Sequence, residues 1–277
     1  MKVVLFCGGL GLRIRDAEDT LKPMVHIGFR PILWHVMKYY AYYGHRDFVL
    51  CLGYRGDLIK NYFLNYNECV SNDFVLSGAG KKLELLNSDI DDWRITFVDT
   101  GLNSNIGQRL KAVEKYLEGE KEFLANYSDG LTDMPLPKQL EHFRQQDKIA
   151  SFLCVRPNLT YHMVSVQESN GNLVSGIHAI NNGTVRINGG FFIFKRRIFD
   201  YIREKEDLVC EPFQRLAEEK QLIGYPYDGF WASMDTFKDK ERLEELNQGV
   251  APWKVWNQTA TTLAGDPNGV TAGPRSA

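Results

Sequence analysis

The first 25 residues combine an apolar run of strand length with a glycine-rich turn and a following lysine. The run is Lys2–Cys7, and the turn after it, Gly8–Gly11, holds three glycines. Glycines let backbone N–H groups come close to phosphate oxygens, and the cations Arg13 and Lys22 add positive charge where a pyrophosphate would leave. Glycines alone also occur in a plain tight turn between a strand and a helix. Together with the Lys-Pro-Met-Val segment that begins at Lys22, they predict a triphosphate site at the end of a strand.

Apolar runs of strand length alternate with helical patterns along the chain. The predicted strands are Val3–Cys7, Asp47–Leu52, Ile95–Asp99, Phe123–Ser128, Ile149–Val155 and Gly189–Phe194. The predicted helices are Pro31–Tyr43, Lys111–Leu117, Pro137–Gln146 and Glu211–Lys220. This alternation predicts an α/β fold with a mixed, mostly parallel sheet covered by helices on both faces. Ligands of such sheets bind at the carboxyl ends of the strands, where both the glycine turn and Asp129 are expected.

The second half of the chain is less regular. Asn, Gly and Ser clusters in Ser165–Ile187 predict short antiparallel strands joined by turns. No domain linker interrupts the pattern, so we expect one catalytic domain over residues 1–257. Residues 258–277 are poor in large apolar side chains and rich in Thr, Gly, Pro and Ala, which predicts a disordered tail.

Composition narrows the class of protein. The net charge of −2 gives no reason to expect nucleic-acid or anionic-membrane binding, and no apolar run approaches the roughly 20 residues that span a bilayer. The chain opens on a strand and not on a cleavable signal, so we expect a cytoplasmic location. The cysteines are odd in number and form no C-x-x-C pair, which predicts free, buried thiols and neither disulfides nor zinc. They are Cys7, Cys51, Cys69, Cys154 and Cys210.

Carboxylates follow two of the apolar segments. Asp129 comes directly after a predicted strand, with Asp133 close behind it, and Asp235 follows the aromatic turn that contains Trp231. A lone aspartate in such a place is usually a cap or turn residue. Two of them beside a phosphate loop predict a divalent-metal site, and magnesium favours a few carboxylates completed by phosphate oxygens and water. Arg109 adds a cation at a predicted helix start.

These motifs, in this order, make the chain resemble the sugar-1-phosphate nucleotidyltransferases, most closely the glucose-1-phosphate cytidylyltransferases. The resemblance runs from residue 1 to about Asn257 and implies a Rossmann-like nucleotidyltransferase fold. It is carried by Gly8-Gly9-Leu10-Gly11, Lys22-Pro23-Met24-Val25, Pro31-Ile32-Leu33-Trp34-His35, Gly53-Tyr54, Val98-Asp99-Thr100-Gly101, Ile187-Asn188-Gly189-Gly190-Phe191-Phe192, Met234-Asp235-Thr236 and Ala251-Pro252-Trp253-Lys254.

The resemblance also implies a reaction. The phosphate of an acceptor such as glucose 1-phosphate attacks the α-phosphorus of CTP, and pyrophosphate leaves, with Mg²⁺ as cofactor. The implied nucleotide-binding residues are Gly8, Gly9, Gly11, Gly53, Arg109 and Ser128, with Gly53 and Arg109 near the cytosine and ribose. The implied catalytic residues are Arg13 on the leaving pyrophosphate, Lys22 on the α-phosphate, and Asp129 and Asp235 on the metal. Family members are oligomeric, so a homo-oligomer is expected.

The chain departs from the family pattern in several places. Leu12 replaces the usual threonine of the glycine loop, Ala179 stands where the family has a phosphate-neutralising lysine, and His162 stands where a glycine makes room for the sugar. Two accounts remain open. The enzyme takes a different, even non-sugar, phosphate, with Arg156 or Arg186 among its contacts, or it is a catalytically silent nucleotide-binding protein. We expect the acceptor-binding residues to be Tyr161, His162, His178, Asn188, Gly189 and Trp231.

Aromatic residues cluster in two further places. The run Trp34–Tyr43 is expected to be core and subunit surface, not a sugar-stacking platform. Near the end of the chain, Trp253 and Trp256 are expected to pack against a neighbouring surface of this chain or of another subunit.

Overall fold

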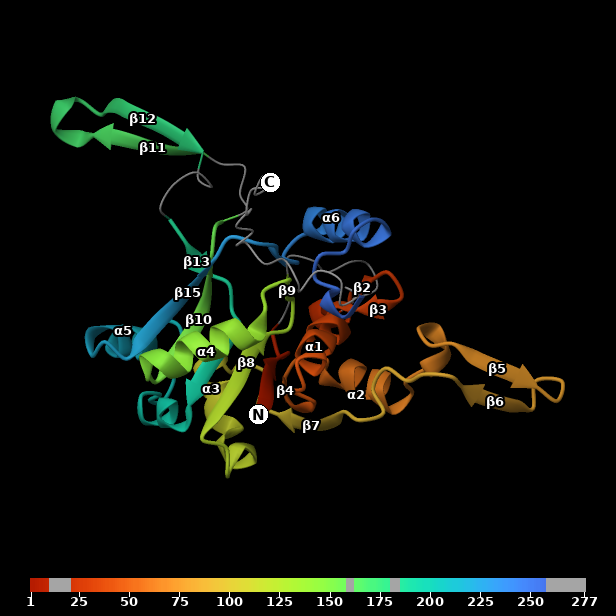
Figure 1. Ribbon diagram of the computed structural model, residues 1–277. Helices are drawn as coiled ribbons and strands as arrows, with labels where there is room; N and C mark the ends of the chain where they lie inside the picture. The colour runs from red at the N-terminus through yellow and green to blue at the C-terminus, as the bar shows by residue number, and fades with distance from the viewer. Residues whose placement is uncertain (10–20, 158–161, 180–184, 258–277) are drawn as a thin grey trace, which may run out of the picture.

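A computed structural model describes residues 1–9, 21–157, 162–179 and 185–257 (Figure 1). An eight-stranded sheet forms its centre. The strands of this sheet are β1 (Lys2–Phe6), β4 (Asp47–Leu52), β7 (Arg94–Asp99), β8 (Glu122–Tyr127), β10 (Ala150–Val155), β13 (Ile187–Asn188), β14 (Phe192–Lys195) and β15 (Leu222–Tyr227). The helices are α1 (Ile32–Tyr42), α2 (Gly56–Leu64), α3 (Ile106–Ala112), α4 (Leu136–Gln146), α5 (Glu211–Glu218) and α6 (Phe237–Gln248).

Strand directions in the sheet are mixed but mostly parallel. β1 lies between β4 and β8 and is parallel to both, and β7 continues the parallel order beyond β4. β14 runs antiparallel between β8 and β10, while β15 is parallel to β10 on the far side. The carboxyl ends of β1, β4, β7 and β8 therefore meet at one edge of the sheet, which is the predicted place for a ligand.

Side chains of the central strands alternate between two cores. Val3 and Leu5 of β1 join a buried cluster that also receives side chains from α1, α2, α4 and α6. Val4 and Phe6 join a second cluster with side chains from α3 and α5. A strand that is buried on both faces reads as a continuous apolar run, as this one does. The predicted α/β fold with helices on both faces is confirmed.

One predicted helix has different bounds. The segment Lys111–Leu117 contains only the end of α3, which begins five residues earlier, and then a separate 3₁₀ turn over Glu114–Leu117. Asn105 and Gln108 form a reciprocal capping box that sets this earlier start: the side chain of Asn105 accepts from Gln108 N at 2.9 Å, and the side chain of Gln108 accepts from Asn105 N at 3.0 Å. A Ser, Thr, Asp or Asn followed three residues later by Gln or Glu is a known start signal, so the sequence carried this information.

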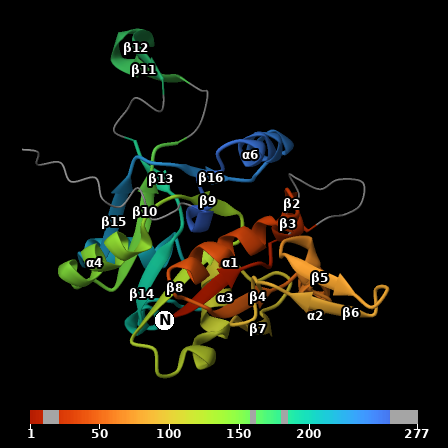
Figure 2. The same cartoon turned by 45° about the vertical axis from the view of Figure 1, so that its right-hand side comes forward.

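Two hairpins extend away from the central sheet, as both views show (Figures 1 and 2). The first, β5–β6 (Phe74–Ser77 and Lys82–Leu85), was not predicted. The second, β11–β12 (His162–Gln167 and Leu173–Ala179), lies in the region predicted to form short antiparallel strands. Two short pairs complete the described strands: β2 (His26–Ile27) with β3 (Arg30–Pro31), and β9 (Gly130–Thr132) with β16 (Trp231–Ser233).

The cysteines are free thiols, as predicted, but they are not all buried. Cys7 and Cys51 are buried in the two cores, and desolvation raises the pKa of Cys7 to about 12, so it stays protonated. Cys69 and Cys154 are half-buried. Cys210 is exposed, because it precedes the first turn of α5 at the surface, so the prediction of burial is wrong for this residue. In the described part of the chain, no helix has the length and apolarity required to cross a membrane.

The C-terminal tryptophans pack on α1 of their own chain. Trp253 is 1% exposed, and its Nε1 donates to Nδ1 of His35 at 3.3 Å. Trp256 stacks on the same imidazole, with ring centroids 6.3 Å apart and planes inclined by 26°. The neighbouring surface that the sequence left open is therefore intramolecular for both residues. Residues 258–277 lie outside the described residues.

Candidate active site

A lysine and two aspartates converge at the carboxyl edge of the sheet. The ammonium of Lys22 lies 2.5 Å from Oδ2 of Asp129 and 2.7 Å from Oδ1 of Asp235. The three residues come from separate parts of the chain: a 3₁₀ turn (Lys22–Met24), the turn after β8, and the turn after β16. The structure thus brings together three of the four residues predicted to be catalytic. Arg13 lies outside the described residues.

The β9–β16 pair brings the two aspartates together. Ser233 of β16 is paired with Gly130 of β9, and the backbone N–H of Met234 donates to the carbonyl oxygen of Asp129 at 3.1 Å. Asp129 immediately precedes β9 and Asp235 closely follows β16. Antiparallel pairing therefore carries both carboxylates to the same end of this short ribbon.

Further polar contacts orient Asp235. Its Oδ2 accepts from the hydroxyl of Ser233 at 2.9 Å. Its backbone N–H donates to Asp239, which also caps α6 in a reciprocal capping box with Thr236. Ser233 and Asp239 were not among the predicted site residues, although the Thr-x-x-Asp spacing is a helix-start pattern that indicates Asp239. The start of α6 thus fixes one carboxylate of the site.

The lysine remains a cation in this setting. The Lys22 side chain is 16% exposed, and those of Asp129 and Asp235 are 20% and 38% exposed. Desolvation by itself would lower the pKa of Lys22, but the charges and hydrogen bonds of the two aspartates outweigh it and raise the pKa above its ordinary value. Lys22 therefore stays protonated and places one positive charge beside the two negative charges of Asp129 and Asp235.

The two carboxylates can supply part of the coordination shell of a divalent metal. In the described residues, no group of three or more His, Cys, Asp or Glu side chains gathers where it could hold an ion. Magnesium commonly takes one or two carboxylates and completes its shell with water and substrate phosphates. Asp129 and Asp235 already direct one oxygen each at a single cation, so the residues present fit a magnesium ion that arrives with a nucleotide.

A buried arginine ties the ends of three parallel strands together. Arg109 is 3% exposed, and its guanidinium donates to protein groups at or just beyond the ends of β1, β4 and β7. These acceptors are the carbonyl oxygens of Gly8 (2.9 Å), Leu52 (3.1 Å), Gly101 (3.0 Å) and Leu102 (3.4 Å) and Oγ1 of Thr100 (2.7 Å). Burial lowers the pKa of Arg109. The observed contacts of Arg109 are structural, and its predicted nearness to cytosine and ribose stays a prediction.

Two of the predicted nucleotide-binding glycines, Gly8 and Gly53, pack against this guanidinium, and Gly9 does not. A β-carbon on Gly8 would lie 2.1 Å from Nη1 of Arg109, and one on Gly53 would lie 2.8 Å from the same atom. Both glycines therefore make room for the arginine. Gly9 is exposed, and among the described residues a β-carbon there would meet nothing within 4 Å. Ser128 is buried and donates to the carbonyl of Phe6 at 2.9 Å. Gly11 lies outside the described residues.

Comparison with known proteins identifies the family of this chain. No protein-family model matches the chain. The glucose-1-phosphate cytidylyltransferase of Salmonella typhi is 37% identical over 261 residues, which cover 92% of this chain and 100% of that protein. The chain belongs to the glucose-1-phosphate cytidylyltransferase family. A probable glucose-1-phosphate cytidylyltransferase of Bacillus subtilis is 34% identical over 260 residues, covering 92% and 100% of the two chains.

Solved structures agree on the fold. A putative glucose-1-phosphate thymidylyltransferase from Bacillus anthracis, in complex with a sucrose, superposes with a TM-score of 0.64 at 16% identity, over 90% of this chain and 96% of that one. The likeness confirms the Rossmann-like nucleotidyltransferase fold. The chain is thus a nucleotidyltransferase of the cytidylyltransferase family.

Two of the predicted acceptor-binding residues, Trp231 and Gly189, are in direct contact. Nε1 of Trp231 donates to the carbonyl oxygen of Gly189 at 2.8 Å, so the indole of β16 crosses to the chain that follows β13. Asp133 holds the segment before Trp231 in place, because it accepts from the hydroxyl of Tyr227 at 2.5 Å and from the backbone N–H of Phe230 at 2.9 Å. Asp133 is thus a loop anchor.

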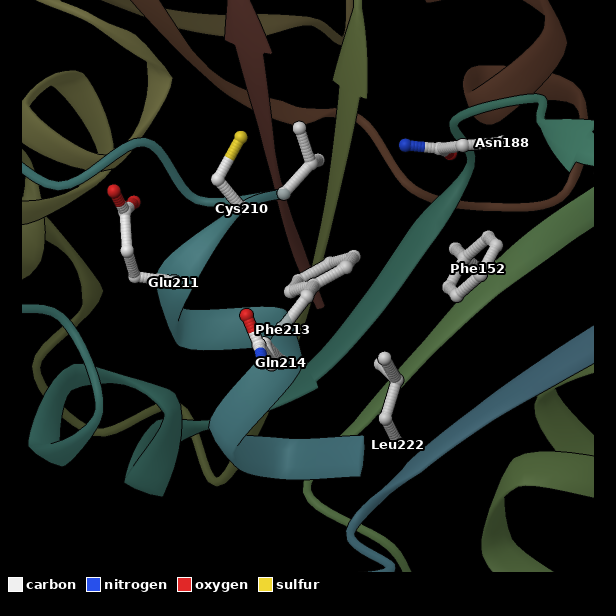
Figure 3. Close-up of a pocket in the computed structure, with 8 residues that line it drawn as sticks. Phe152, Asn188, Cys210, Glu211, Phe213, Gln214 and Leu222 are labelled. Carbon is white, nitrogen blue, oxygen red and sulfur yellow. The ribbon is translucent and has the colours of Figure 1, made fainter. Parts of the chain in front are cut away.

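The side chain of Asn188 leaves the sheet on the other face. It lines an open cavity of about 680 Å³ with Phe152, Cys210 and Phe213 (Figure 3). Phe152 and Phe213 pack in the core with α3 and α5, whereas Trp231 packs with the core that includes α1 and α4. The side chains of Asn188 and Trp231 therefore pack with different cores, and the predicted contact of Asn188 with the acceptor stays a prediction.

The predicted histidines are not gathered at the Lys22 site. His162 and His178 are exposed on the β11–β12 hairpin, which lies apart from β9 and β16 in both views (Figures 1 and 2). No contact within the described residues joins either imidazole to Lys22, Asp129 or Asp235. Tyr161 lies outside the described residues.

Two arginines meet one aspartate beside the predicted acceptor residues. Nε of Arg156 lies 2.8 Å from Oδ1 of Asp228, and Nη2 of Arg186 lies 3.0 Å from the same oxygen. Arg186 also donates to the carbonyls of Cys154 and Tyr227, which fixes it at the end of β10 and β15. Hydrogen bonds from Arg156 and then Arg186 lower the pKa of Asp228. Both arginines are thus paired with Asp228 at the edge of the sheet.

Proposed function

We propose that the protein transfers a cytidylyl group from CTP to the phosphate of a sugar 1-phosphate, forming a CDP-sugar and releasing pyrophosphate. The observation that carries the proposal is the convergence of Lys22 with Asp129 and Asp235 at the carboxyl edge of the sheet. It is supported by relatives of 34–37% identity that are named glucose-1-phosphate cytidylyltransferases.

The chemistry asks little of the protein beyond position and charge. A phosphate oxygen of the acceptor attacks the α-phosphorus of CTP, and the bond from that phosphorus to the bridging oxygen of pyrophosphate breaks. A phosphate monoester is already ionised near pH 7, so the attack needs no general base. Lys22 would neutralise charge that develops on the α-phosphate, which is the kind of term that dominates phosphoryl transfer.

Asp129 and Asp235 would hold magnesium in this scheme. When bound, the metal supplies charge neutralisation for the phosphate oxygens. The protein's own part is to keep the two carboxylates in register, through the β9–β16 pairing and the contacts from Ser233 and Asp239 to Asp235. The backbone of Gly9, exposed at the end of β1, would contribute N–H groups to the nucleotide phosphates.

Two kinds of acceptor are candidates: glucose 1-phosphate and a different phosphate. Glucose 1-phosphate is the acceptor in the names of the relatives. A different phosphate is favoured by Ala179, which stands where the family has its phosphate-neutralising lysine, and by the cationic cluster of Arg156 and Arg186 around Asp228. We also propose a cytoplasmic homo-oligomer, supported by the exposed apolar side chains on both hairpins.

A pyrophosphate-release assay tests the proposal. CTP, UTP, ATP and GTP would each be offered with magnesium and with a panel of sugar and non-sugar phosphates. We expect release above background with CTP and at least one acceptor, and none with Asp235→Asn. Calorimetry would show CTP binding more tightly than the other three nucleotides, and only with magnesium. Nucleotide binding without release for any acceptor would instead support a silent binding protein.

A further inference from the structure

Lys22 contacts both carboxylates that the family reaction assigns to a metal. Its ammonium is in direct contact with one oxygen of Asp129 and one of Asp235. Two carboxylates held this close repel each other unless a cation lies between them. Lys22 supplies that cation from within the chain, and all three side chains are more than half buried.

We propose that Lys22 is an internal counter-ion that competes with the divalent cation for Asp129 and Asp235. The metal then binds strongly only after a nucleotide phosphate has drawn the lysine away. This inference rests on the proposed function for the identity of the metal and of the anion, but its central claim concerns only the three side chains. It makes Lys22 the residue that couples metal binding to nucleotide binding.

The competition follows from distances and charge. Magnesium would need the same carboxylate oxygens at about 2.0–2.1 Å, while the ammonium already contacts them at 2.5 and 2.7 Å. A dication and an ammonium that share these oxygens would lie within a few ångströms of each other and repel strongly in a half-buried site. The two cations cannot occupy the site together. Because the lysine is part of the chain and the metal is not, the metal is the one excluded while the ammonium stays in place.

The lysine is able to move. Lys22 begins a 3₁₀ turn of three residues, and its neighbours Leu21, Pro23 and Met24 carry the local packing. A four-carbon stem ending in a compact charge can reorient without moving the backbone. A triphosphate brings its own oxygens and offers the ammonium new partners of the same sign as the ones it leaves. By linkage, nucleotide then raises metal affinity and metal raises nucleotide affinity by the same factor.

Metal binding to the protein alone tests the proposal, with no nucleotide or acceptor present. Mn²⁺ is the probe, because its free concentration can be followed by electron paramagnetic resonance. Lys22→Met keeps the length of the side chain and removes the charge. We expect this variant to bind Mn²⁺ at least about tenfold more tightly than the wild type, since losing an ion-pair competitor is worth about 1.4 kcal/mol or more. Adding Asp129→Asn to it should abolish the gain.

A matched control separates a local effect from a change in total charge. Lys38 also pairs with a buried carboxylate, because its Nζ lies 3.1 Å from Oδ1 of Asp89, and its exposure is similar. Lys38→Met should leave Mn²⁺ affinity unchanged. Equal or weaker Mn²⁺ binding by folded Lys22→Met would overturn the proposal, as would an equal gain in Lys38→Met.

A second measurement uses the wild type and does not depend on whether a variant folds. In protein labelled at the lysine ammonium nitrogens, the resonance of the paired Lys22 should shift as Mg²⁺ saturates the site. A resonance that stays unchanged at saturation would also overturn the inference. Both readouts are independent of turnover. If the protein does not transfer cytidylyl groups but gives the expected result in both tests, the proposed function is refuted and the competition between Lys22 and the metal is supported.

Discussion

Arg109 and Gly8 lie so close that a single methyl group on the glycine would collide with the guanidinium. A β-carbon at Gly8 would stand 2.1 Å from Nη1 and 2.3 Å from the central carbon of the arginine side chain. The same guanidinium donates to carbonyl oxygens at the ends of three neighbouring strands, so it cannot shift without losing these hydrogen bonds. The predicted phosphate turn therefore begins at a position set by a buried cation.

Gly8→Ala should destabilise the protein because the alanine must push Arg109 away from its acceptors. Overpacking of this kind commonly costs about 1–3 kcal/mol in the free energy of unfolding. Urea denaturation would measure the loss. Gly9→Ala is the matched control, since a β-carbon there meets nothing within 4 Å in the described part of the chain, and it should leave the denaturation midpoint unchanged. Equal midpoints for the two variants would refute the close contact.

Lys22→Ala should abolish most turnover and leave the fold intact. Removing one electrostatic stabiliser of a transition state typically lowers the rate roughly a hundred- to a thousandfold. Steady-state kinetics with CTP would give the ratio, and circular dichroism would verify folding. A variant that keeps more than about a tenth of the wild-type rate would show that Lys22 is not the group that stabilises the reacting phosphate.

The central strands could be predicted because burial on both faces leaves a continuous apolar run in the sequence. β4 matches the predicted Asp47–Leu52 in full, and β7 and β10 differ by one residue at their starts. The antiparallel direction of β14 could not be predicted, since direction depends on how the chain returns to the sheet. The β5–β6 hairpin was missed because its apolar side chains are exposed and its strands are short.

The members of the site could be named from motifs, but their contacts could not. Asp129 and Asp235 are 106 positions apart, and only the β9–β16 pairing explains why they meet. The contacts of Arg109 were beyond prediction for another reason. Most of its acceptors are backbone carbonyls, which every residue type carries, so the pairing leaves no trace in the sequence.

Acid should destabilise the protein through His35. Burial lowers the pKa of His35 to about 4, and the ring stays neutral between the carbonyl of Ile27 and Nε1 of Trp253. The unfolded chain takes up a proton near pH 6.5, so the stabilisation is complete above that pH and is lost as the pH falls toward 4. The loss is of the order of 3 kcal/mol over this window.

The free energy of unfolding measured from pH 7.5 to pH 4 checks this expectation. His45, whose pKa burial also lowers to about 4, contributes to the same slope. His35→Gln cannot be protonated and keeps a donor and an acceptor, so it should flatten the profile between pH 6.5 and pH 4. An unchanged slope in this variant would assign the acid sensitivity to other groups.

The acceptor preference is the most discriminating property to measure. Ala179 has no charge to pair with a phosphate dianion, and a lost charge-assisted contact costs about 1.5–3 kcal/mol, roughly ten- to a hundredfold in affinity. We therefore expect weak activity with glucose 1-phosphate and better activity with a phosphate that Arg186 or Arg156 can reach. Arg186→Gln should then raise KM for the preferred acceptor about tenfold and leave KM for CTP unchanged.

Lys220→Gln, at an exposed lysine after α5, is the control for Arg186→Gln and should change neither KM value. An efficiency for glucose 1-phosphate above about 10⁴ M⁻¹s⁻¹, the low end for ordinary enzymes, would show that the family acceptor is bound well without the lysine, and the arginine cluster would then be only a structural tie between β10 and β15.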